Sequence, residues 1–382
     1  MEYKINLCDD QTCTQCFACE QACPKHCITH VESGSGFYIP QIDRDTCIEC
    51  GACMNACHVI KTEKLRYQKP LNAYACWTKK TSDRERSSSG GAFSVLARKI
   101  LQQGGVVFGA TMSKDLEIKH IEIDKESDIH LLQGSKYVQS NLQNIYRLVS
   151  VHLKNNRLVL FTGTPCQISG LYVFLKRNYT NLYTCDLVCH GVPSQKAFDI
   201  YLDRMNLRTN TCSFGFRFTK GWGMQLSKTS NNSKREIIMP NQGYYLRAFN
   251  MGLMFNEPCY SCKYARPERV SDLTIADFWG IGKAKKFNHP RRKGISLMLV
   301  NNEHGLQLMN SCEDLFKEER PVEEAVKGNF NLNQSSVRPL GRDTYYEDSK
   351  NLDYMELQKK YHIAPTLKDY LRIVKQVVLS KL

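Results

Sequence analysis

Eight of the eighteen cysteines in this 382-residue chain form two copies of one spacing, and this repeat limits how the N-terminal segment can fold. Each copy has three cysteines at three-residue steps and a fourth four residues later. Three thiolates spaced in this way on a tight loop can bind one metal cluster. The fourth lies on the next helical turn and can reach a second cluster. The spacing therefore predicts a ferredoxin-like module with two [4Fe-4S] clusters, one bound by Cys13, Cys16, Cys19 and Cys57 and the other by Cys47, Cys50, Cys53 and Cys23.

A zinc site is the main alternative, because cysteine pairs separated by two residues are also typical of zinc-binding proteins. Zinc takes four ligands for each ion and does not explain three equal steps followed by a fourth cysteine, twice over. The second copy has His58 where the first has Pro24 after its last cysteine. Because this proline shapes a turn and binds no iron, we expect His58 to affect the geometry or potential of a cluster and not its presence. Cys8 and Cys27 are interpreted as ordinary buried thiols.

Length predicts two or three domains, and we assign residues 1–66 to the ferredoxin domain. With 42% hydrophobic residues, the rest of the chain can bury a core of its own. Cysteines that bind iron must stay reduced, which indicates a reducing compartment. The first residues contain no apolar signal region and no apolar run is long enough to span a bilayer, so we expect a cytoplasmic protein.

The formal net charge of +14 also restricts the partners. It falls to about +8 if twelve cysteine thiolates bind three clusters, each with a core charge of about +2. A basic surface favours acidic redox proteins such as small ferredoxins, anionic cofactors or anionic substrates. Nucleic acid is the alternative, but the sequence contains no motif of a known nucleic-acid-binding fold.

Helical and strand patterns alternate after the connector at 61–71. This order predicts an α/β domain with a mainly parallel sheet, which binds ligands at the carboxyl ends of its strands. The expected helices are 92–102, 141–153, 168–177 and 195–207, and the expected strands are 106–110, 118–123, 157–161, 182–188, 213–218, 273–280 and 294–301.

Residues 331–382 are interpreted as a polar tail that ends in an amphipathic helix, with Tyr370, Leu371, Val374, Val377 and Val378 on one face. We expect this helix to pack against its own domain; a membrane surface or a partner is the alternative.

Four further cysteines stand where strands meet loops, and strand ends converge on one face of a sheet. They are Cys166, Cys189, Cys259 and Cys262. From spacing alone a third cluster, a zinc site and separate buried thiols all remain open. Cys76, Cys185, Cys212 and Cys312 have no assigned role.

Residues 70–330 resemble the beta subunits of coenzyme F420-dependent hydrogenases and dehydrogenases, flavoproteins that also include related chlorophyll-pathway reductases. The resemblance rests on segments in the same order: Arg-Ser-Ser-Ser-Gly-Gly at 86–91, Gly-Ser-Lys-Tyr-Val-Gln-Ser at 134–140, Gly-Thr-Pro-Cys-Gln at 163–167, Asp-Leu-Val-Cys-His-Gly-Val-Pro at 186–193, Cys259-x2-Cys262, and Ala-Asp-Phe-Trp-Gly at 276–280. It implies FAD beside an iron–sulfur cluster, with Cys166, Cys189, Cys259 and Cys262 as ligands of a third [4Fe-4S] cluster. Many members carry a ferredoxin domain in front.

The same segments contain candidate flavin contacts. Small residues that open a helix can hold a pyrophosphate at the positive end of its dipole, and these are Ser87, Ser88, Ser89, Gly90 and Gly91. A plain helix cap would need only one serine. Lys136 is the candidate for stabilising negative charge on the reduced flavin or a phosphate; a solvated loop lysine is its alternative.

Further polar residues complete the candidate site. Gln139 and Ser140 are candidates for hydrogen bonds to the flavin ring or ribitol, and Thr164 and Gln167 flank a cysteine and can contact both cofactors. His190 is either a proton donor to the flavin or substrate or a hydrogen-bonding neighbour of the cluster, and we favour the second role. The basic loop 283–293 is interpreted as a solvated face, with docking of an acidic protein or anionic substrate as the alternative.

These observations predict an iron–sulfur flavoprotein oxidoreductase in which single electrons pass through the clusters to FAD, which reacts with an organic substrate by two electrons. If the family function holds, that substrate is coenzyme F420. A non-catalytic electron-transfer subunit and a zinc-stabilised binding protein are the alternatives.

Overall fold

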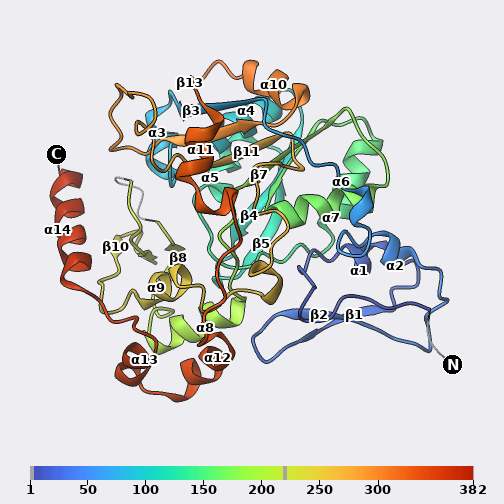
Figure 1. The fold of residues 1–382 in the computed structure, drawn as a ribbon, viewed down its shortest axis with the longest axis horizontal. Helices are drawn as coiled ribbons and strands as arrows, with labels where there is room; N and C mark the ends of the chain where they lie inside the picture. Colours follow the sequence, from blue (N-terminus) through green and yellow to red (C-terminus); the bar gives the residue numbers. More distant parts are fainter. Residues whose placement is uncertain (1–3, 218–221, 382) are drawn as a thin grey trace.

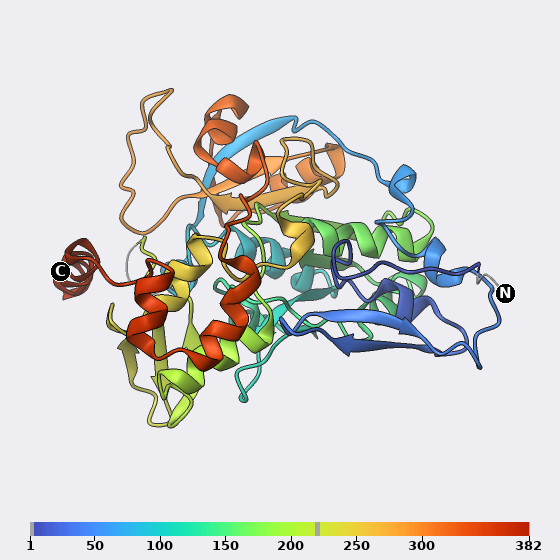
Figure 2. The same cartoon turned by 60° about the horizontal axis from the view of Figure 1, so that its bottom comes forward.

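The computed structural model describes residues 4–217 and 222–381 (Figure 1). The N-terminal segment contains two short helices, α1 (Ala18–Ala22) and α2 (Ala52–Asn55), a 3-10 turn η1 (Thr62–Lys64), and the hairpin of β1 (Ile28–Glu32) and β2 (Tyr38–Ile42). This segment forms a lobe at one side of the molecule, away from the C-terminus, in both ribbon views (Figure 2).

The backbone of this lobe repeats the symmetry of its sequence. Phe17 and Gly51 follow the second cysteine of each copy, and both have positive φ (57° and 70°) where α1 and α2 begin. Gln15 and Glu49, which precede that cysteine, also have positive φ (55° and 51°). Each loop therefore turns in the same way around its first three cysteines.

The remainder is organised around a mixed sheet of eight strands in the order β13-β3-β12-β11-β7-β6-β4-β5. The four neighbours β11, β7, β6 and β4 are parallel, whereas the pairings at both sides are antiparallel. The predicted parallel order thus describes the centre of the sheet. The strands are β3 (Asn72–Thr78), β4 (Val106–Met112), β5 (Ile118–Ile123), β6 (Val159–Gly163), β7 (Leu182–Leu187), β11 (Leu273–Asp277), β12 (Ser296–Val300) and β13 (Leu315–Arg320).

Helices cover both faces of this sheet, because alternate strand residues are apolar on each side. Leu160 of β6 belongs to a core that includes α4 and α10, while its neighbours Val159 and Phe161 belong to a core that includes α6 and α7. The helices around the sheet are α3 (Thr81–Arg86), α4 (Ala92–Gln102), η2 (Glu126–Asp128), α5 (Ile129–Leu132), α6 (Ile145–Lys154), α7 (Pro165–Leu175), α10 (Glu303–Asn310), α11 (Val322–Gly328) and η4 (Phe330–Leu332).

A third, aromatic core lies beside the sheet. It combines the small sheet β10-β9-β8 with helices from two distant parts of the chain. Phe198, Phe214 and Tyr245 are buried there together with Tyr345 from the C-terminal segment. The elements are α8 (Gln195–Arg204), β8 (Thr211–Gly215), β9 (Ser227–Ser230), β10 (Arg235–Ile237), α9 (Tyr244–Asn250), η3 (Glu257–Cys259), α12 (Arg342–Asn351) and α13 (Tyr354–Lys360). The predicted strand 213–218 starts two residues earlier, and Phe218 lies outside the described residues.

The C-terminal segment differs from the expected polar tail. Its helices α12 and α13 bury Tyr345, Tyr346 and Leu357, and Tyr361 directly after α13 is buried as well. Tyrosine rings supply apolar surface within an otherwise polar sequence, which is why this segment can pack on the body.

The last helix, α14 (Leu367–Lys381), projects from the body (Figure 1). The expectation that it packs on its own domain is wrong for its described side chains: Leu371 and Val374 are 58% and 59% exposed, and Ile373 alone is buried among them. The side chains of Val377 and Val378 lie outside the described part. Within the described residues, every helix is too short or too polar to cross a membrane.

Candidate functional site

The eight repeat cysteines line two small cavities in the N-terminal lobe. One cavity is lined by Cys13, Cys16, Cys19 and Cys57, and the other by Cys23, Cys47, Cys50 and Cys53. Each cavity thus receives three cysteines from one copy of the repeat and one from the other, which is the crossed grouping that the spacing predicts. We call them the first and second cysteine cavities.

Each of these cavities also contains a fifth cysteine. Cys8 Sγ lies 3.6 Å from Cys57 Sγ in the first cavity, and Cys27 Sγ lies 3.4 Å from Cys23 Sγ in the second. A hydrogen bond from Cys8 lowers the pKa of Cys57 to about 6. The interpretation of Cys8 and Cys27 as ordinary buried thiols missed this contact, because neither belongs to the repeat and no spacing points to it.

The four cysteines of the larger domain come together beside the carboxyl ends of β6 and β7. Cys166 lies in the first turn of α7, which begins at Pro165 and not at 168 as predicted, and Cys189 follows β7. Cys259 ends η3, and Cys262 follows in the next turn. Burial and then the charges of Cys166 and Cys262 raise the pKa of Cys189 to about 12, and burial followed by the charges of the other three cysteines raises the pKa of Cys259. We call these residues the third cysteine group.

Within 4–217 and 222–381, no three His, Cys, Asp or Glu side chains converge tightly enough to hold a single metal ion. A four-iron cluster needs a wider arrangement, because its cysteines surround a cube of iron and sulfide ions.

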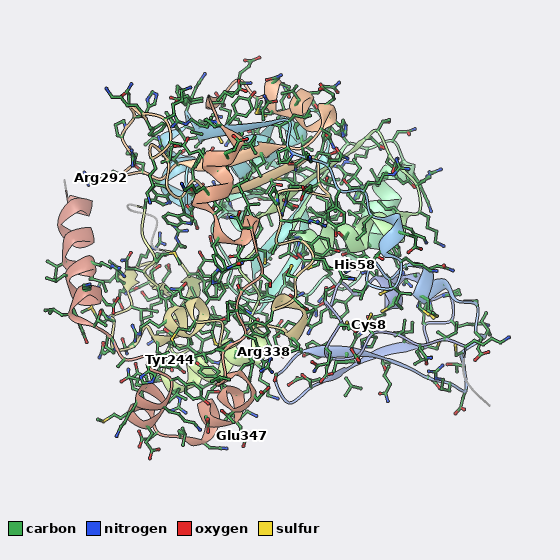
Figure 3. The ribbon with its side chains drawn as sticks, viewed as in Figure 1. Cys8, His58, Tyr244, Arg292, Arg338 and Glu347 are labelled. Atoms are coloured by element: carbon green, nitrogen blue, oxygen red, sulfur yellow. The ribbon has the colours of Figure 1, made fainter. Side chains whose placement is uncertain are left out.

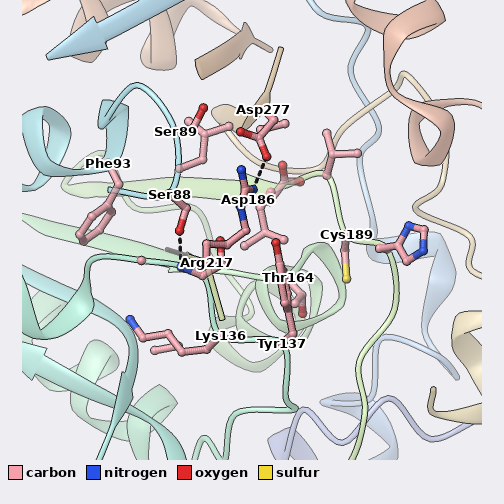
Figure 4. A pocket seen from close by; sticks show the side chains of 18 of the residues that line it. Ser88, Ser89, Phe93, Lys136, Tyr137, Thr164, Asp186, Cys189, Arg217 and Asp277 are labelled. Carbon is pink, nitrogen blue, oxygen red and sulfur yellow. Dashed lines mark hydrogen bonds and ion pairs between the residues drawn. The ribbon is translucent and has the colours of Figure 1, made fainter. Parts of the chain in front are cut away.

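The third cysteine group borders a cavity of about 650 Å³ at the carboxyl ends of the central strands (Figure 4). Residues at the ends of three parallel strands line it, represented by Thr164 after β6, Asp186 and Cys189 at the end of β7, and Asp277 in β11. This is the edge at which ligands bind in α/β sheets. All the candidate flavin contacts except Gly90 line this cavity.

The serine loop forms one wall of the cavity. Gly91 precedes α4 with φ of 82°, and within the described residues no side chain caps this helix end. Ser88 Oγ accepts a hydrogen bond from the Ser135 amide at 2.8 Å, and Ser87 Oγ donates to the Asp83 carbonyl. Ser89 Oγ is buried and has no hydrogen-bond partner in the described structure. Free amides at the positive helix end and an unpartnered hydroxyl suit an anionic group.

Gly90 supports the loop from behind. A Cβ atom at this position would lie 2.4 Å from the Cys76 carbonyl oxygen, so only glycine allows the loop to approach β3 this closely.

Lys136 lies on the opposite wall and is half-buried. Its Nζ donates to the carbonyl oxygens of Leu132 and Gln133 at 3.0 and 2.9 Å. Burial of the ammonium lowers its pKa to about 7. The side chain is thus held against its own loop, and its role toward a flavin or phosphate stays a prediction.

Three of the predicted polar contacts already have partners within the protein. Gln167 Oε1 accepts from the Thr164 amide in a capping box, and Gln167 Nε2 donates to Ser140 Oγ at 3.0 Å. Ser140 Oγ also bonds His120 Nδ1 at 2.7 Å. Gln139 Nε2 contacts the Gln15 carbonyl in the N-terminal lobe at 3.4 Å. These side chains shape the cavity, and a ligand could bond them only by sharing or replacing their present hydrogen bonds.

His190 lines the cavity, and its Nδ1 lies 2.8 Å from Asn331 Oδ1, so a side chain of the C-terminal segment fixes the ring. The residues of the basic loop 283–293 that carry positive charge are exposed, as expected for a solvated face. The loop contacts the rest of the site through the Arg292 carbonyl, which accepts from the Trp222 amide at 3.0 Å.

Sequence reasoning missed a charged cluster in the same cavity. Arg217 Nη1 pairs with Asp277 Oδ2 at 2.6 Å, and Trp222 Nε1 donates to Asp277 Oδ1 at 2.5 Å. Trp222 stacks on Trp279 with ring centres 4.9 Å apart. Arg217 Nη2 and Asp186 Oδ1 are buried without partners in the described structure. Asp277 and Trp279 belong to the quoted segment at 276–280, but no motif marked Arg217 or Trp222.

Two family models match the sequence. The model for the C terminus of the coenzyme F420 hydrogenase/dehydrogenase beta subunit matches residues 156–324, and the model of the 4Fe-4S dicluster domain matches residues 12–60. No curated protein matches the chain. Among solved structures, a chain of the F420-reducing [NiFe] hydrogenase complex from Methanosarcina barkeri is similar, with 17% identity, a TM-score of 0.48, and coverage of 77% of this chain and 91% of that one. The predicted resemblance is confirmed by the two family models.

Proposed function

We propose that this chain, which combines a 4Fe-4S dicluster domain with a segment of the coenzyme F420 hydrogenase/dehydrogenase beta subunit family, is an iron–sulfur flavoprotein oxidoreductase. The observation that carries the proposal is that the third cysteine group borders the large cavity: Cys189 belongs to the group and also lines the cavity, as does Thr164, whose Oγ1 lies 3.1 Å from Cys166 Sγ. A third [4Fe-4S] cluster bound there would be next to whatever the cavity holds.

The polar groups of the cavity fit FAD. The uncapped N-terminus of α4 and the unpartnered Ser89 Oγ would hold its diphosphate, and the ammonium of Lys136 would offset negative charge on the opposite wall. When bound, FAD would exchange single electrons for the electron pair of a hydride-type reaction.

The protein's own residues would do three things around this group. The Arg217–Asp277 pair would fix the position of a ligand, since the guanidinium is held by a carboxylate from β11 and by the Gly223 carbonyl. Asn331 would hold the His190 ring in one orientation. A fixed ring is compatible with both roles considered for His190, a hydrogen bond to the cluster and proton transfer at Nε2. Three partly exposed apolar side chains at the cavity, Leu187, Trp279 and Phe330, would exclude water from a substrate that enters between them.

Coenzyme F420 is our first candidate for the two-electron substrate, because the matching family is described by it. The proposed source or acceptor of single electrons is a second redox protein or subunit. A non-catalytic electron-transfer role is the alternative, and it differs only in whether this chain itself converts an organic substrate.

The test is anaerobic purification or reconstitution of the full chain, followed by iron and sulfide analysis, flavin extraction and turnover. We expect about twelve iron atoms and one FAD per chain, and reduction of coenzyme F420 with dithionite or reduced ferredoxin as donor. Bound clusters and flavin without turnover of any organic acceptor would support the electron-transfer alternative. Zinc without iron would overturn the proposal.

A further inference from the structure

His58, the departure from the ferredoxin repeat, connects the first cysteine cavity to the third cysteine group. The residue directly follows Cys57 and is 2% exposed. Its Nε2 lies 2.8 Å from Thr14 Oγ1, next to Cys13, and its Nδ1 lies 2.7 Å from the Tyr264 hydroxyl. Figure 3 shows His58 where the N-terminal lobe meets the body of the molecule. Tyr264 is also buried, two residues after Cys262.

The first cavity contacts the segments that carry three of the four cysteines of the third group, Cys166, Cys259 and Cys262. Gly170 of α7, four residues after Cys166, approaches Cys16 so closely that a Cβ atom would lie 3.0 Å from its Sγ. Asn256, which caps η3 ahead of Cys259, donates from Nδ2 to the Cys13 carbonyl at 2.9 Å. The first cavity is therefore fitted against the third group.

The second cavity is placed differently. Its Cys50 is exposed, and the neighbouring Ile48 is 58% exposed. The first cavity therefore lies against the third group, whereas the second cavity has an exposed cysteine.

Proline at position 58 could not make the contacts of this imidazole. Its ring has no polar atom, whereas histidine bonds partners on both sides at once. One path from the first to the third group then consists of covalent bonds from Cys57 to His58, one hydrogen bond to Tyr264, and covalent bonds to Cys262.

We infer that His58 is a positioning residue that fixes the first cysteine cavity on the third cysteine group and provides a bonded route for electron transfer between them. This inference rests on the proposed function. The step moves one electron: the centre in the first cavity is oxidised, the centre at the third group is reduced by the same electron, and no bond is made or broken.

The test compares His58→Phe and Tyr264→Phe in the reconstituted full chain. Both remove the hydrogen bond while keeping an aromatic ring in place. Tyr67→Phe is the matched control, because the Tyr67 ring lies 6.2 Å from that of Tyr264 but is outside the His58 path. Rapid-freeze electron paramagnetic resonance after reduction would follow the electron at each centre and the magnetic interaction between neighbouring centres.

We expect electron arrival at the third centre to slow severalfold in both variants and to stay unchanged in Tyr67→Phe, with unchanged iron content and unchanged reduction of the first two centres. If the electron reaches the third centre in Tyr264→Phe as fast as in the parent, the inference is overturned. Tyr264→Phe remains decisive even if His58→Phe loses the first cluster, because Tyr264→Phe does not change the ferredoxin sequence. Failure of the proposed function would look different, because the parent itself would then lack a third centre or flavin.

Discussion

The two cysteine cavities of the N-terminal lobe and the large cavity of the sheet domain are built in opposite ways. The cysteine cavities take their eight repeat residues from 45 consecutive positions, 13 to 57, and position them with paired backbone turns of the same hand. The large cavity takes its wall from residues between 87 and 331 and contains buried polar atoms without partners in the described structure. The first kind of site is built from one local repeat, whereas the second is assembled by tertiary packing of distant segments.

The largest expected effect tests which cysteines of the N-terminal lobe bind iron, the repeat cysteines or the additional cysteine in each cavity. Cys57→Ala should remove the first cluster, with loss of about four iron atoms per chain. Cys8→Ala should retain all the iron, because Cys8 only contacts Cys57. Iron analysis and the low-temperature spin signal measure both. Retention of iron in Cys57→Ala together with its loss in Cys8→Ala would show that Cys8 is the actual ligand.

A second test removes the buried ion pair of the large cavity. Arg217→Met leaves Asp277 with the Trp222 hydrogen bond but without its cationic partner. The variant should destabilise the fold by about 3–5 kcal/mol, because a mostly buried carboxylate then has no counter-ion. Arg208→Met is the control: it breaks two exposed pairs and should change the free energy of unfolding by less than about 1 kcal/mol. Denaturant unfolding of the reconstituted chain measures both. Equal small effects would mean that the Arg217 pair is no more important than a surface pair.

The same comparison explains what the sequence could and could not predict. The crossed grouping of cysteines was predictable because the ligand positions and the turns between them are local and repeated. The rule that parallel strand ends converge accounts for Cys166 and Cys189, which follow β6 and β7. Cys259 and Cys262 lie in η3 and in the turn after it, not at a strand end as expected, so only the family resemblance grouped them with the other two. Arg217 and Trp222 were not, because they come from the strand-and-loop region after residue 211 and reach Asp277 only through tertiary packing.

The C-terminal segment shows the other limit. Its tyrosine-rich helices looked polar by composition, yet Tyr345 and Tyr346 are buried, and Asn331 holds the His190 ring in the large cavity. Conversely, the spacing of apolar residues correctly predicted that α14 is a helix, but it did not predict what the apolar face of this helix contacts.

The serine loop offers a smaller, ligand-specific test. Ser89→Ala should weaken FAD binding by about 1.5–3 kcal/mol if its unpartnered hydroxyl bonds a charged phosphate. Ser87→Ala is the control within the same loop: its hydroxyl donates to the Asp83 carbonyl, so this variant should lower stability and leave the flavin affinity of the folded fraction near that of the parent. Flavin titration of the deflavinated protein measures both. Parent-like affinity in Ser89→Ala would remove Ser89 from the phosphate site.

The smallest expected effect is a pH dependence that belongs to Lys136 alone. Its pKa is lowered from 10.5 to about 7, so the ammonium that attracts an anionic flavin is progressively lost above pH 7. FAD affinity should therefore fall between about pH 6 and pH 9 in the parent and become flatter in Lys136→Met. The ligand-free protein should behave in the opposite direction: between about pH 7 and pH 10.5 its unfolded state binds more protons at this group, so Lys136 contributes a stability that rises with pH. If the parent and Lys136→Met show the same pH profile for FAD binding, the ammonium does not contact the anionic part of the ligand.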